Sequence, residues 1–289
     1  MDETPRFACQ GDRDVLTDLW LACFPGDTVE TVQAVFDRVT LETDALVIER
    51  DGIPVSMVFL LAQQYRTDAG LYPVQYIYAA ATLPAYRGRG LCRTLLETAF
   101  EIGRERGQTA SFLRPASPPL SDYYRRLGYR PFFRAQERRF FSGRLNETAG
   151  FPQLHRVRDY GAAREAALSS GPAHVLWDER WTAFAQRMAE KAGGGGFAFD
   201  GISGCALCEP DGETLFIREL LCPPERTGAC LASLHAQFQL PDILCRMPSK
   251  PTANPEEDGF GLWYPLNEEG RRLLESAASC RPYMGLALD

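Results

Sequence analysis

Residues 82–93, Thr-Leu-Pro-Ala-Tyr-Arg-Gly-Arg-Gly-Leu-Cys-Arg, decide how the N-terminal half of this chain is interpreted. A strand pattern ends here, a proline and two glycines follow, and an amphipathic helix pattern begins at Leu91. Gly88 and Gly90 lack a Cβ, so the backbone can adopt left-handed angles and approach a ligand closely. The first N–H groups of a helix have no partner inside it and lie in the positive potential of the helix dipole. Three arginines add full charge: Arg87, Arg89 and Arg93. The stretch therefore predicts an anion site that suits a pyrophosphate.

Strand and helix patterns alternate on both sides of this stretch. Strands are expected at 45–49, 55–63, 74–82, 110–113 and 132–141, and helices at 12–24, 28–39, 91–106 and 120–127. Such alternation predicts an α/β fold. Periodicity is lost over 142–152, so we expect one domain over residues 1–143 and a second over 150–289.

The second half is expected to be a diverged copy of the first. A shift of 138 positions brings four pairs of identical residues into register: Gly90 with Gly228, Cys92 with Cys230, Leu96 with Leu234, and Phe100 with Phe238. Chance could supply four matches. In the same register Arg87 falls on Glu225, a reversal of charge that would repel phosphates in the second copy.

Three further segments of the second half carry expectations. The run Gly193–Gly196 precedes a strand rather than a helix and is expected to be a flexible loop. The segment from Lys250 to Gly259 is expected to be a polar loop, and residues 284–288 a terminal strand. In the first half, Arg138 and Arg139 lie inside the expected strand 132–141 and indicate an edge or a solvated face.

Composition limits the compartment and the partners. The formal net charge of −7 argues against nucleic acid as a main partner, since phosphate binding needs a basic face. The nine cysteines are odd in number and scattered, the N-terminus lacks the pattern of a signal peptide, and no apolar run would span a bilayer. We therefore expect a cytoplasmic protein with free thiols and no membrane partner, and leave a homo-oligomer open.

The loop motif resembles that of a known family. It fits neither the Walker A pattern nor the dinucleotide pattern G-x-G-x-x-G. It matches R-x-x-G-x-(G/A), the acetyl-CoA loop of the GNAT (GCN5-related N-acetyltransferase) superfamily, except that Cys92 stands at the last position. The resemblance implies a GNAT fold, a mixed central sheet flanked by helices, and transfer of an acetyl group from acetyl-CoA without a metal. The phrase Arg-Gly-Leu-Cys-Arg-Thr-Leu-Leu at 89–96 looks most like the Eis branch, which implies a second, degenerate GNAT-like domain. We expect no full third domain of the kind that Eis-like enzymes carry.

The resemblance also implies roles for individual residues. Residues 122–129, Asp-Tyr-Tyr-Arg-Arg-Leu-Gly-Tyr, are similar to the helix end that carries the general acid of GNAT enzymes, and Tyr124 takes that position. In the Eis branch the terminal carboxylate can act as a base, which makes Asp289 a second catalytic candidate. The candidate acetyl-CoA residues are Ala80, Ala81, Thr82, Arg87, Gly88, Arg89, Gly90, Leu91, Cys92 and Arg93.

The acceptor stays open at this stage. Asp27 and Glu30 could attract a cationic amine, although residues at such a position more often form a solvated helix start. Tyr76 and Tyr78, two apart on a strand, share one face and could line an acceptor pocket. We expect a small-molecule or peptide amine as the acceptor. The alternative is a non-catalytic acyl-CoA-binding regulatory module.

The Cys-x-x-Cys pattern of residues 205–208 does not predict a metal or redox site. Zinc sites of this kind usually need a second such pair, and none is present. Cys205 and Cys208 also lie three apart in an expected strand, which would send their side chains to opposite faces. We expect no metal.

Overall fold

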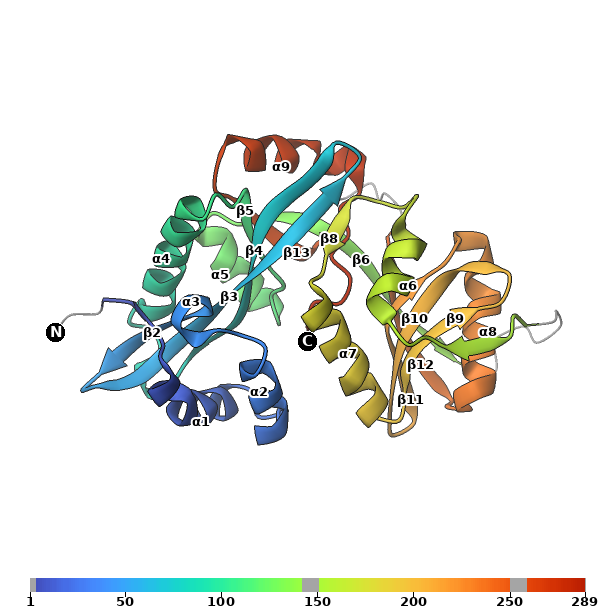
Figure 1. Ribbon diagram of the computed structural model, residues 1–289, viewed down its shortest axis with the longest axis horizontal. Helices are drawn as coiled ribbons and strands as arrows, with labels where there is room; N and C mark the ends of the chain where they lie inside the picture. The colour runs from blue at the N-terminus through green and yellow to red at the C-terminus, as the bar shows by residue number, and fades with distance from the viewer. Residues whose placement is uncertain (1–3, 142–150, 250–258, 289) are drawn as a thin grey trace. The chain divides into compact units, whose positions relative to one another are not determined.

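The computed structural model describes residues 4–141, 151–249 and 259–288, and it divides the chain into two compact units (Figure 1). Unit 1 comprises Met1–Gln63, Tyr72–Arg130 and Leu262–Glu275. Unit 2 comprises Gln64–Leu71, Pro131–Gly261 and Ser276–Asp289. The units interleave along the chain, whereas the expected domains 1–143 and 150–289 followed one another.

Unit 1 is built on a mixed sheet with the strand order β1-β2-β3-β4-β5-β13. Strand β4 pairs with β5 in parallel, and β13 pairs with β5 antiparallel. The strands are β1 (Arg6–Phe7), β2 (Ala45–Arg50), β3 (Ile53–Thr67), β4 (Gly70–Thr82), β5 (Ala110–Leu113) and β13 (Gly259–Pro265). The helices are η1 (Gln10–Asp12), α1 (Arg13–Cys23), α2 (Val29–Phe36), α3 (Leu41–Asp44), η2 (Pro84–Tyr86), α4 (Leu91–Glu105), α5 (Pro118–Arg126) and α9 (Glu268–Cys280).

Helices cover both faces of this sheet because its strands are apolar on both sides. On one face, α4 buries Leu95 and Leu96 against a cluster that includes Ile48, Val58 and Ile77. On the other face, Trp20 of α1 contacts the rings of Phe59 and Tyr78. The apolar spacing of α4 thus selects the face that it covers and fixes where its N-terminus lies.

Unit 2 has a second sheet with the strand order β6-β12-β11-β10-β9-β7. Strand β11 pairs with β12 in parallel, and β6 pairs with β12 antiparallel. Its strands are β6 (Arg130–Phe141), β7 (Leu154–Arg156), β9 (Gly195–Phe199), β10 (Ile202–Asp211), β11 (Thr214–Leu221) and β12 (Asp242–Pro248). Strand β8 (His174–Leu176) lies outside this order and pairs antiparallel with residues 64–66 of β3. The helices are α6 (Tyr160–Leu168), α7 (Glu179–Lys191), η4 (Pro224–Arg226) and α8 (Thr227–Phe238).

The two units repeat one topology, as the sequence predicted. The order β1-β2-β3-β4-β5-β13 matches β7-β9-β10-β11-β12-β6, and each unit has one parallel pair, β4 with β5 and β11 with β12. In each unit a 3-10 turn and a helix join the strands of that pair. The last strand is exchanged, because β6 follows α5 of unit 1 but completes unit 2, and β13 follows β12 of unit 2 but completes unit 1.

The residue pairs that predicted the repeat occupy only partly equivalent positions in the two units. Gly90 precedes α4 with a φ of 85°, whereas Gly228 is the second residue of α8 and has no left-handed φ. Helix α8 follows η4 directly, so unit 2 lacks a counterpart of the loop 87–90. Insertions and deletions between the copies explain why one fixed shift cannot align both ends.

Two expectations for the second half were wrong. Gly195 and Gly196 belong to strand β9, and a Cβ on Gly194 would collide with the carbonyl of Cys208. The glycines therefore permit close packing of backbone on backbone and do not form a flexible loop. Residues 284–288 are not a strand, because Gly285, Ala287 and Leu288 have positive φ values that an extended chain does not adopt. Most of the expected polar loop from Lys250 lies outside the described residues.

A buried ion pair anchors the segment before the C-terminus within unit 2. Arg164 and Glu219 are both fully buried, and the Arg164 Nε atom lies 3.0 Å from Glu219 Oε2. Tyr160 donates its hydroxyl to the same carboxylate, and Arg164 Nη2 donates to the Met284 carbonyl at 3.4 Å. The pair therefore links two elements of the unit to the chain around Met284.

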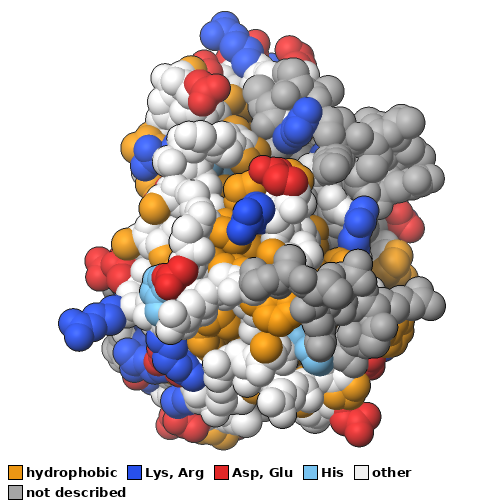
Figure 2. All heavy atoms as spheres, turned by 90° about the vertical axis from the view of Figure 1, so that its right-hand side faces the viewer, with side chains coloured by type: hydrophobic (Ala, Val, Ile, Leu, Met, Phe, Trp, Pro, Cys, Tyr) orange, Lys and Arg blue, Asp and Glu red, His pale blue; other side chains and the backbone are white. Residues whose placement is uncertain are grey.

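The surface of the protein carries charges of both signs. Figure 2 shows that basic and acidic side chains both occur on the face it views, with apolar side chains exposed between them, so no patch of one sign covers that face. Among the described residues, no helix is both long enough and apolar enough to span a bilayer.

Candidate active site

The end of strand β4 offers an unpaired backbone edge. Parallel pairing joins Val74, Gln75 and Tyr76 to Ala110, Ser111 and Phe112. Strand β4 then runs on to Thr82, and within the described residues its register with β5 stops at Tyr76. Backbone N–H and C=O groups beyond that point can therefore bond a ligand that lies alongside the strand, as a further strand would.

A break in the side-chain alternation of β4 changes the direction in which the backbone groups of this edge point. Ala79 has a φ of 46°, a left-handed conformation that is uncommon for any residue other than glycine. Ile77 and Ala80 consequently pack on the same side of the sheet, against the cluster that α4 covers, although they are three residues apart. Such a bulge twists a strand and redirects its hydrogen-bonding groups, so it separates the last residues of β4 from β5.

The loop from Arg87 to Gly90 forms an open cradle at the start of α4. Gly88 and Gly90 have φ values of 75° and 85°, and a Cβ at either position would meet nothing within 4 Å. Glycine is therefore needed at both positions for the left-handed backbone angles, and the space in front of both residues is open. The first intrahelical bond of α4 runs from Thr94 N to the Gly90 carbonyl, which leaves the preceding amides of the helix to face outward.

Three arginines lie around this cradle, and two of them are braced by backbone carbonyls. The Nε atom of Arg87 donates to the Thr82 carbonyl at 2.9 Å, so its guanidinium is fixed at the end of β4. Arg89 donates to the Ala85 carbonyl at 3.1 Å and lies over the ring of Tyr86. Arg93 is exposed in the first turn of α4. Their charges together match the anion site that residues 82–93 predicted.

Tyr124 lies beside the first turn of α4. Its ring is 8% exposed, and it contacts the rings of Tyr123 and Tyr129 edge to face. Burial raises the pKa of Tyr124, and the neighbouring thiol of Cys92 raises it further. Burial likewise raises the pKa of Cys92, although a hydrogen bond with Tyr123 opposes that shift. The phenol therefore stays protonated and can donate a proton next to the helix that carries the anion cradle.

The opposite face of β4 carries a second aromatic group. Tyr76 and Tyr78 stack with ring centroids 5.9 Å apart, which confirms that they share one face. Tyr78 also lies against Trp20, whose indole nitrogen donates to Asp27 at 2.7 Å. Burial raises the pKa of Tyr78, and the carboxylate of Asp27 contributes to the shift. Asp27 is therefore held by Trp20 near these tyrosines and is more than a solvated helix start.

The described residues bring the loop and Tyr124 together but leave one candidate untested. Asp289 lies outside them. Two polar side chains that the sequence did not single out brace the end of β4: Ser56, whose hydroxyl donates to the Ala81 carbonyl at 3.0 Å, and Cys23, whose thiol donates to the Thr82 carbonyl at 3.4 Å. A lone serine inside the apolar strand 53–67 was the one available signal for Ser56.

Comparisons with known proteins agree with this geometry. A family model described as an acetyltransferase (GNAT) domain matches residues 4–132. No curated protein matches the sequence.

Solved structures match nearly the whole chain. A conserved protein of unknown function from Enterococcus faecalis, titled a probable N-acyltransferase, has a TM-score of 0.72 at 15% identity and covers 92% of this chain and 73% of its own. A GCN5-related N-acetyltransferase from Anabaena variabilis has a TM-score of 0.71 at 16% identity, with 91% and 73% covered. Eis1 from Mycobacterium abscessus has a TM-score of 0.66 at 12% identity, with 92% and 74% covered. At such identities the likeness shows a shared fold over both units. The family model adds that residues 4–132, the N-terminal part of the chain, match an acetyltransferase (GNAT) domain.

Proposed function

We propose that unit 1 transfers the acetyl group of acetyl-CoA to an amine by direct attack in a ternary complex. The observation that carries the proposal is the continuity of three features: the unpaired edge of β4 from Ile77, the open cradle 87–90, and Tyr124 next to Cys92. Acetyl-CoA has a chemical partner for each feature: its amide-bearing arm for the edge of β4, its pyrophosphate for the cradle, and its thioester for the proton of Tyr124.

The residues divide the binding between them. The amides of Leu91, Cys92 and Arg93 and the guanidinium groups of Arg87 and Arg89 would hold the pyrophosphate. Backbone groups of Ala80, Ala81 and Thr82 would bond the pantetheine arm alongside β4. The glycines leave this path free of side chains, and Ser56 keeps the strand end in place.

The chemistry then needs one acid and a site for developing negative charge. The neutral amine forms a bond to the thioester carbonyl carbon, and backbone N–H groups at the end of β4 would stabilise the oxygen as it becomes negative. The carbon–sulfur bond breaks next, and Tyr124 would give its proton to the departing thiolate. The amine proton passes to solvent or to a base, for which Asp289 stays a candidate.

The acceptor is a small-molecule or peptide amine in this proposal. Asp27, held by Trp20 near Tyr76 and Tyr78, would favour a cation at the acceptor side of β4. An aromatic wall beside a carboxylate suits an aliphatic ammonium group, because both the charge and the apolar stem find partners.

A Tyr124→Phe variant, matched by Tyr123→Phe, tests the catalytic proposal. With acetyl-CoA and a panel of aliphatic amines, we expect Tyr124→Phe to lower kcat by roughly 100-fold or more, while Tyr123→Phe retains most of it. Calorimetric affinity for CoA should stay within a factor of about two in both variants. Equal loss in the two variants would show that Tyr124 serves only in packing.

A CoA titration of thermal stability separates binding from catalysis. We expect CoA to raise the Tm of the wild type by mass action and to fail with Arg87→Glu, with Arg126→Glu as a control for the loss of an exposed arginine. CoA binding without turnover on any amine would favour a non-catalytic acyl-CoA-binding module. No binding by a folded wild-type protein would reject both readings.

A further inference from the structure

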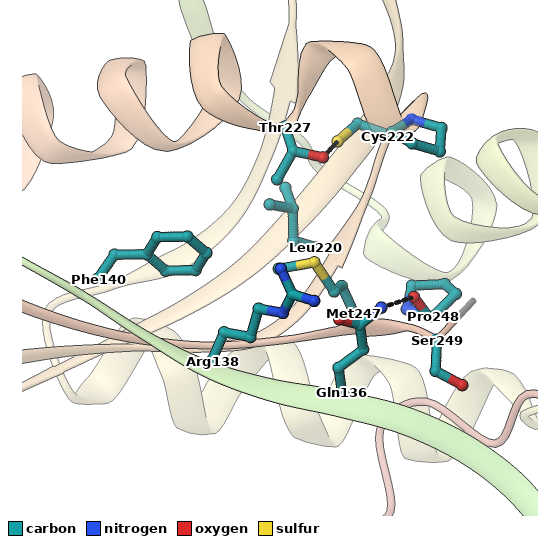
Figure 3. A pocket seen from close by; sticks show the side chains of 10 residues that line it. Gln136, Arg138, Phe140, Leu220, Cys222, Thr227, Met247, Pro248 and Ser249 are labelled. Atoms are coloured by element: carbon teal, nitrogen blue, oxygen red, sulfur yellow. Dashed lines mark hydrogen bonds between the residues drawn. The ribbon is translucent and has the colours of Figure 1, made fainter. Parts of the chain in front are cut away.

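Unit 2 contains a pocket at the carboxyl ends of its two parallel strands. The pocket has a volume of about 420 Å³, within the range of small-molecule sites. Leu220 and Cys222 line it from the end of β11, and Met247 and Pro248 line it from the end of β12 (Figure 3). The register of β11 with β12 runs from Thr214–Asp242 to Ile217–Cys245, so the pocket lies beyond the paired segment. Crevices outside the carboxyl ends of parallel strands are the usual ligand positions in open α/β sheets.

The lining of this pocket combines apolar surface with one charged side chain. Phe140, Leu220 and Met247 provide apolar walls, and Arg138 is the charged residue among the ten that line the pocket. Figure 3 shows Arg138 extending from β6 toward Leu220 and Met247. Within the part of the chain that the structure describes, neither a salt bridge nor a hydrogen bond involves its guanidinium. The neighbouring Arg139, in contrast, lies 3.5 Å from Asp242.

The missing phosphate cradle limits the classes of ligand that this pocket can bind. Helix α8 begins at Thr227 directly after η4, and unit 2 has no counterpart of the loop 87–90 that would hold a pyrophosphate. The single guanidinium among the lining residues instead matches one planar anionic group, which it can bond with two parallel N–H donors. Arg138 is exposed, which confirms the expected solvated face, and its side chain also lines this pocket.

We infer that unit 2 binds a small monocarboxylate, with the carboxylate on Arg138 and the apolar body between Phe140, Leu220 and Met247. This site is separate from the acetyl-transfer residues of unit 1 and does not depend on the function proposed for them. The carboxylate would supply the partner that Arg138 lacks, and the apolar lining would leave water on binding.

A thiol in the pocket wall makes the inference testable without knowledge of the natural ligand. Cys222 lies 3.7 Å from the Thr227 hydroxyl, measured from its Sγ atom. Hydrogen bonding with Cys230 is the main cause that lowers the pKa of Cys222, which favours its reactive thiolate. The rate at which Cys222 is alkylated therefore reports on what enters the pocket.

The first experiment compares two alkylating reagents of similar size, iodoacetate and iodoacetamide, by peptide mass spectrometry on the full chain. The ratio of their rates at Cys222, divided by the same ratio at the exposed Cys9, cancels the reactivity of each thiolate and leaves the preference for an anion. We expect a ratio of roughly five or more in the wild type and near one in Arg138→Gln. Arg139→Gln removes the same charge one residue away and should keep the ratio.

The second experiment measures protection of Cys222 from iodoacetamide. Hexanoate should slow the alkylation in the wild type and not in Arg138→Gln, and the neutral hexanamide should have little effect. No preference for iodoacetate and no protection by hexanoate, in a folded wild type, would overturn the inference. Protection by hexyl phosphate alone would reject the carboxylate in favour of a phosphate ester.

Discussion

The ring of Tyr264 in β13 lies parallel to the ring of Phe100 in α4, with centroids 3.9 Å and planes 5° apart. Tyr264 also covers Gly128, where a Cβ would lie 2.9 Å from the tyrosine ring. The exchanged strand thus holds both the helix that begins at the anion cradle and the turn that follows α5. The fold of the candidate active site depends on a residue far along the chain.

Tyr264→Ala should therefore destabilise unit 1. Because the ring is half-buried, we expect the free energy of unfolding to fall by about 2–3 kcal/mol in urea, somewhat less than for a fully buried aromatic side chain. Tyr264→Phe keeps the stack and should cost less than about 1 kcal/mol. A loss of similar size in both variants would mean that the hydroxyl, and not the stack, stabilises the unit.

Gly90→Ala tests the conformation of the cradle. The φ of 85° strains any L-residue, and we expect a loss of about 1–2 kcal/mol in unfolding free energy although nothing lies near the added methyl. Affinity for CoA should fall several-fold, because the outward amides of α4 shift. Gly26→Ala is the matched control, since its Cβ also meets nothing within 4 Å and its φ is not left-handed. An unchanged CoA affinity in Gly90→Ala would remove the cradle from the site.

Loss of the Tyr124 proton should not lower the turnover rate on the alkaline side of the pH profile. Its role as an acid requires the protonated phenol, which is lost only as pH rises through its pKa. Burial raises the pKa of Tyr124 above the ordinary value, so kcat should show no falling limb between about pH 7 and pH 10. Steady-state rates at saturating acetyl-CoA and amine test this. A falling limb in that window that Tyr124→Phe abolishes would contradict it.

Asp12 should protect the fold against acid. Its hydrogen bond with Arg6 is the largest cause that lowers the pKa of Asp12 to about 2. A lowered pKa stabilises the folded state above the unfolded-state value of about 4, and this stabilisation disappears as pH falls toward about 2. Asp12→Asn should cost about 1 kcal/mol at neutral pH, because Arg6 is partly in water, and the cost should shrink toward pH 2. Asp18→Asn, at an exposed position, should show no such trend.

Removing one charge of the buried pair Arg164–Glu219 in unit 2 should strongly lower the free energy of unfolding. Glu219→Gln leaves the buried Arg164 with the partly exposed Glu165 as its remaining carboxylate partner, and we expect a loss of about 3 kcal/mol in unfolding free energy. The double change Glu219→Leu with Arg164→Met removes both charges and should cost less than the single change. Glu213→Gln, which is exposed, serves as the control. If Glu219→Leu and Arg164→Met are each measured alone and their losses add up to that of the double variant, the pair is not coupled.

Local patterns predicted what depends on local physics. The strand ending at Thr82, the helix beginning at Leu91 and the glycine angles between them follow from residue type and spacing, and the structure confirms them. The strand β13 was missed because its pairing with β5 lies far away in sequence. The contact of Cys92 with Tyr123 was also beyond the sequence, since it depends on how α5 packs on α4. The prediction of a flexible loop at Gly194 was wrong because glycine occurs both in flexible loops and where two backbone segments pack closely.

The exchange of β6 and β13 has a consequence for synthesis on the ribosome. Strand β5 emerges long before β13, the strand that covers its free side, because all of β6 to β12 must be translated first. The nascent N-terminal half therefore presents an unpaired edge that can join with other chains. A fragment that ends at residue 132 would keep that edge unpaired because it lacks β13, so the N-terminal sheet is complete only after the C-terminal part has been translated.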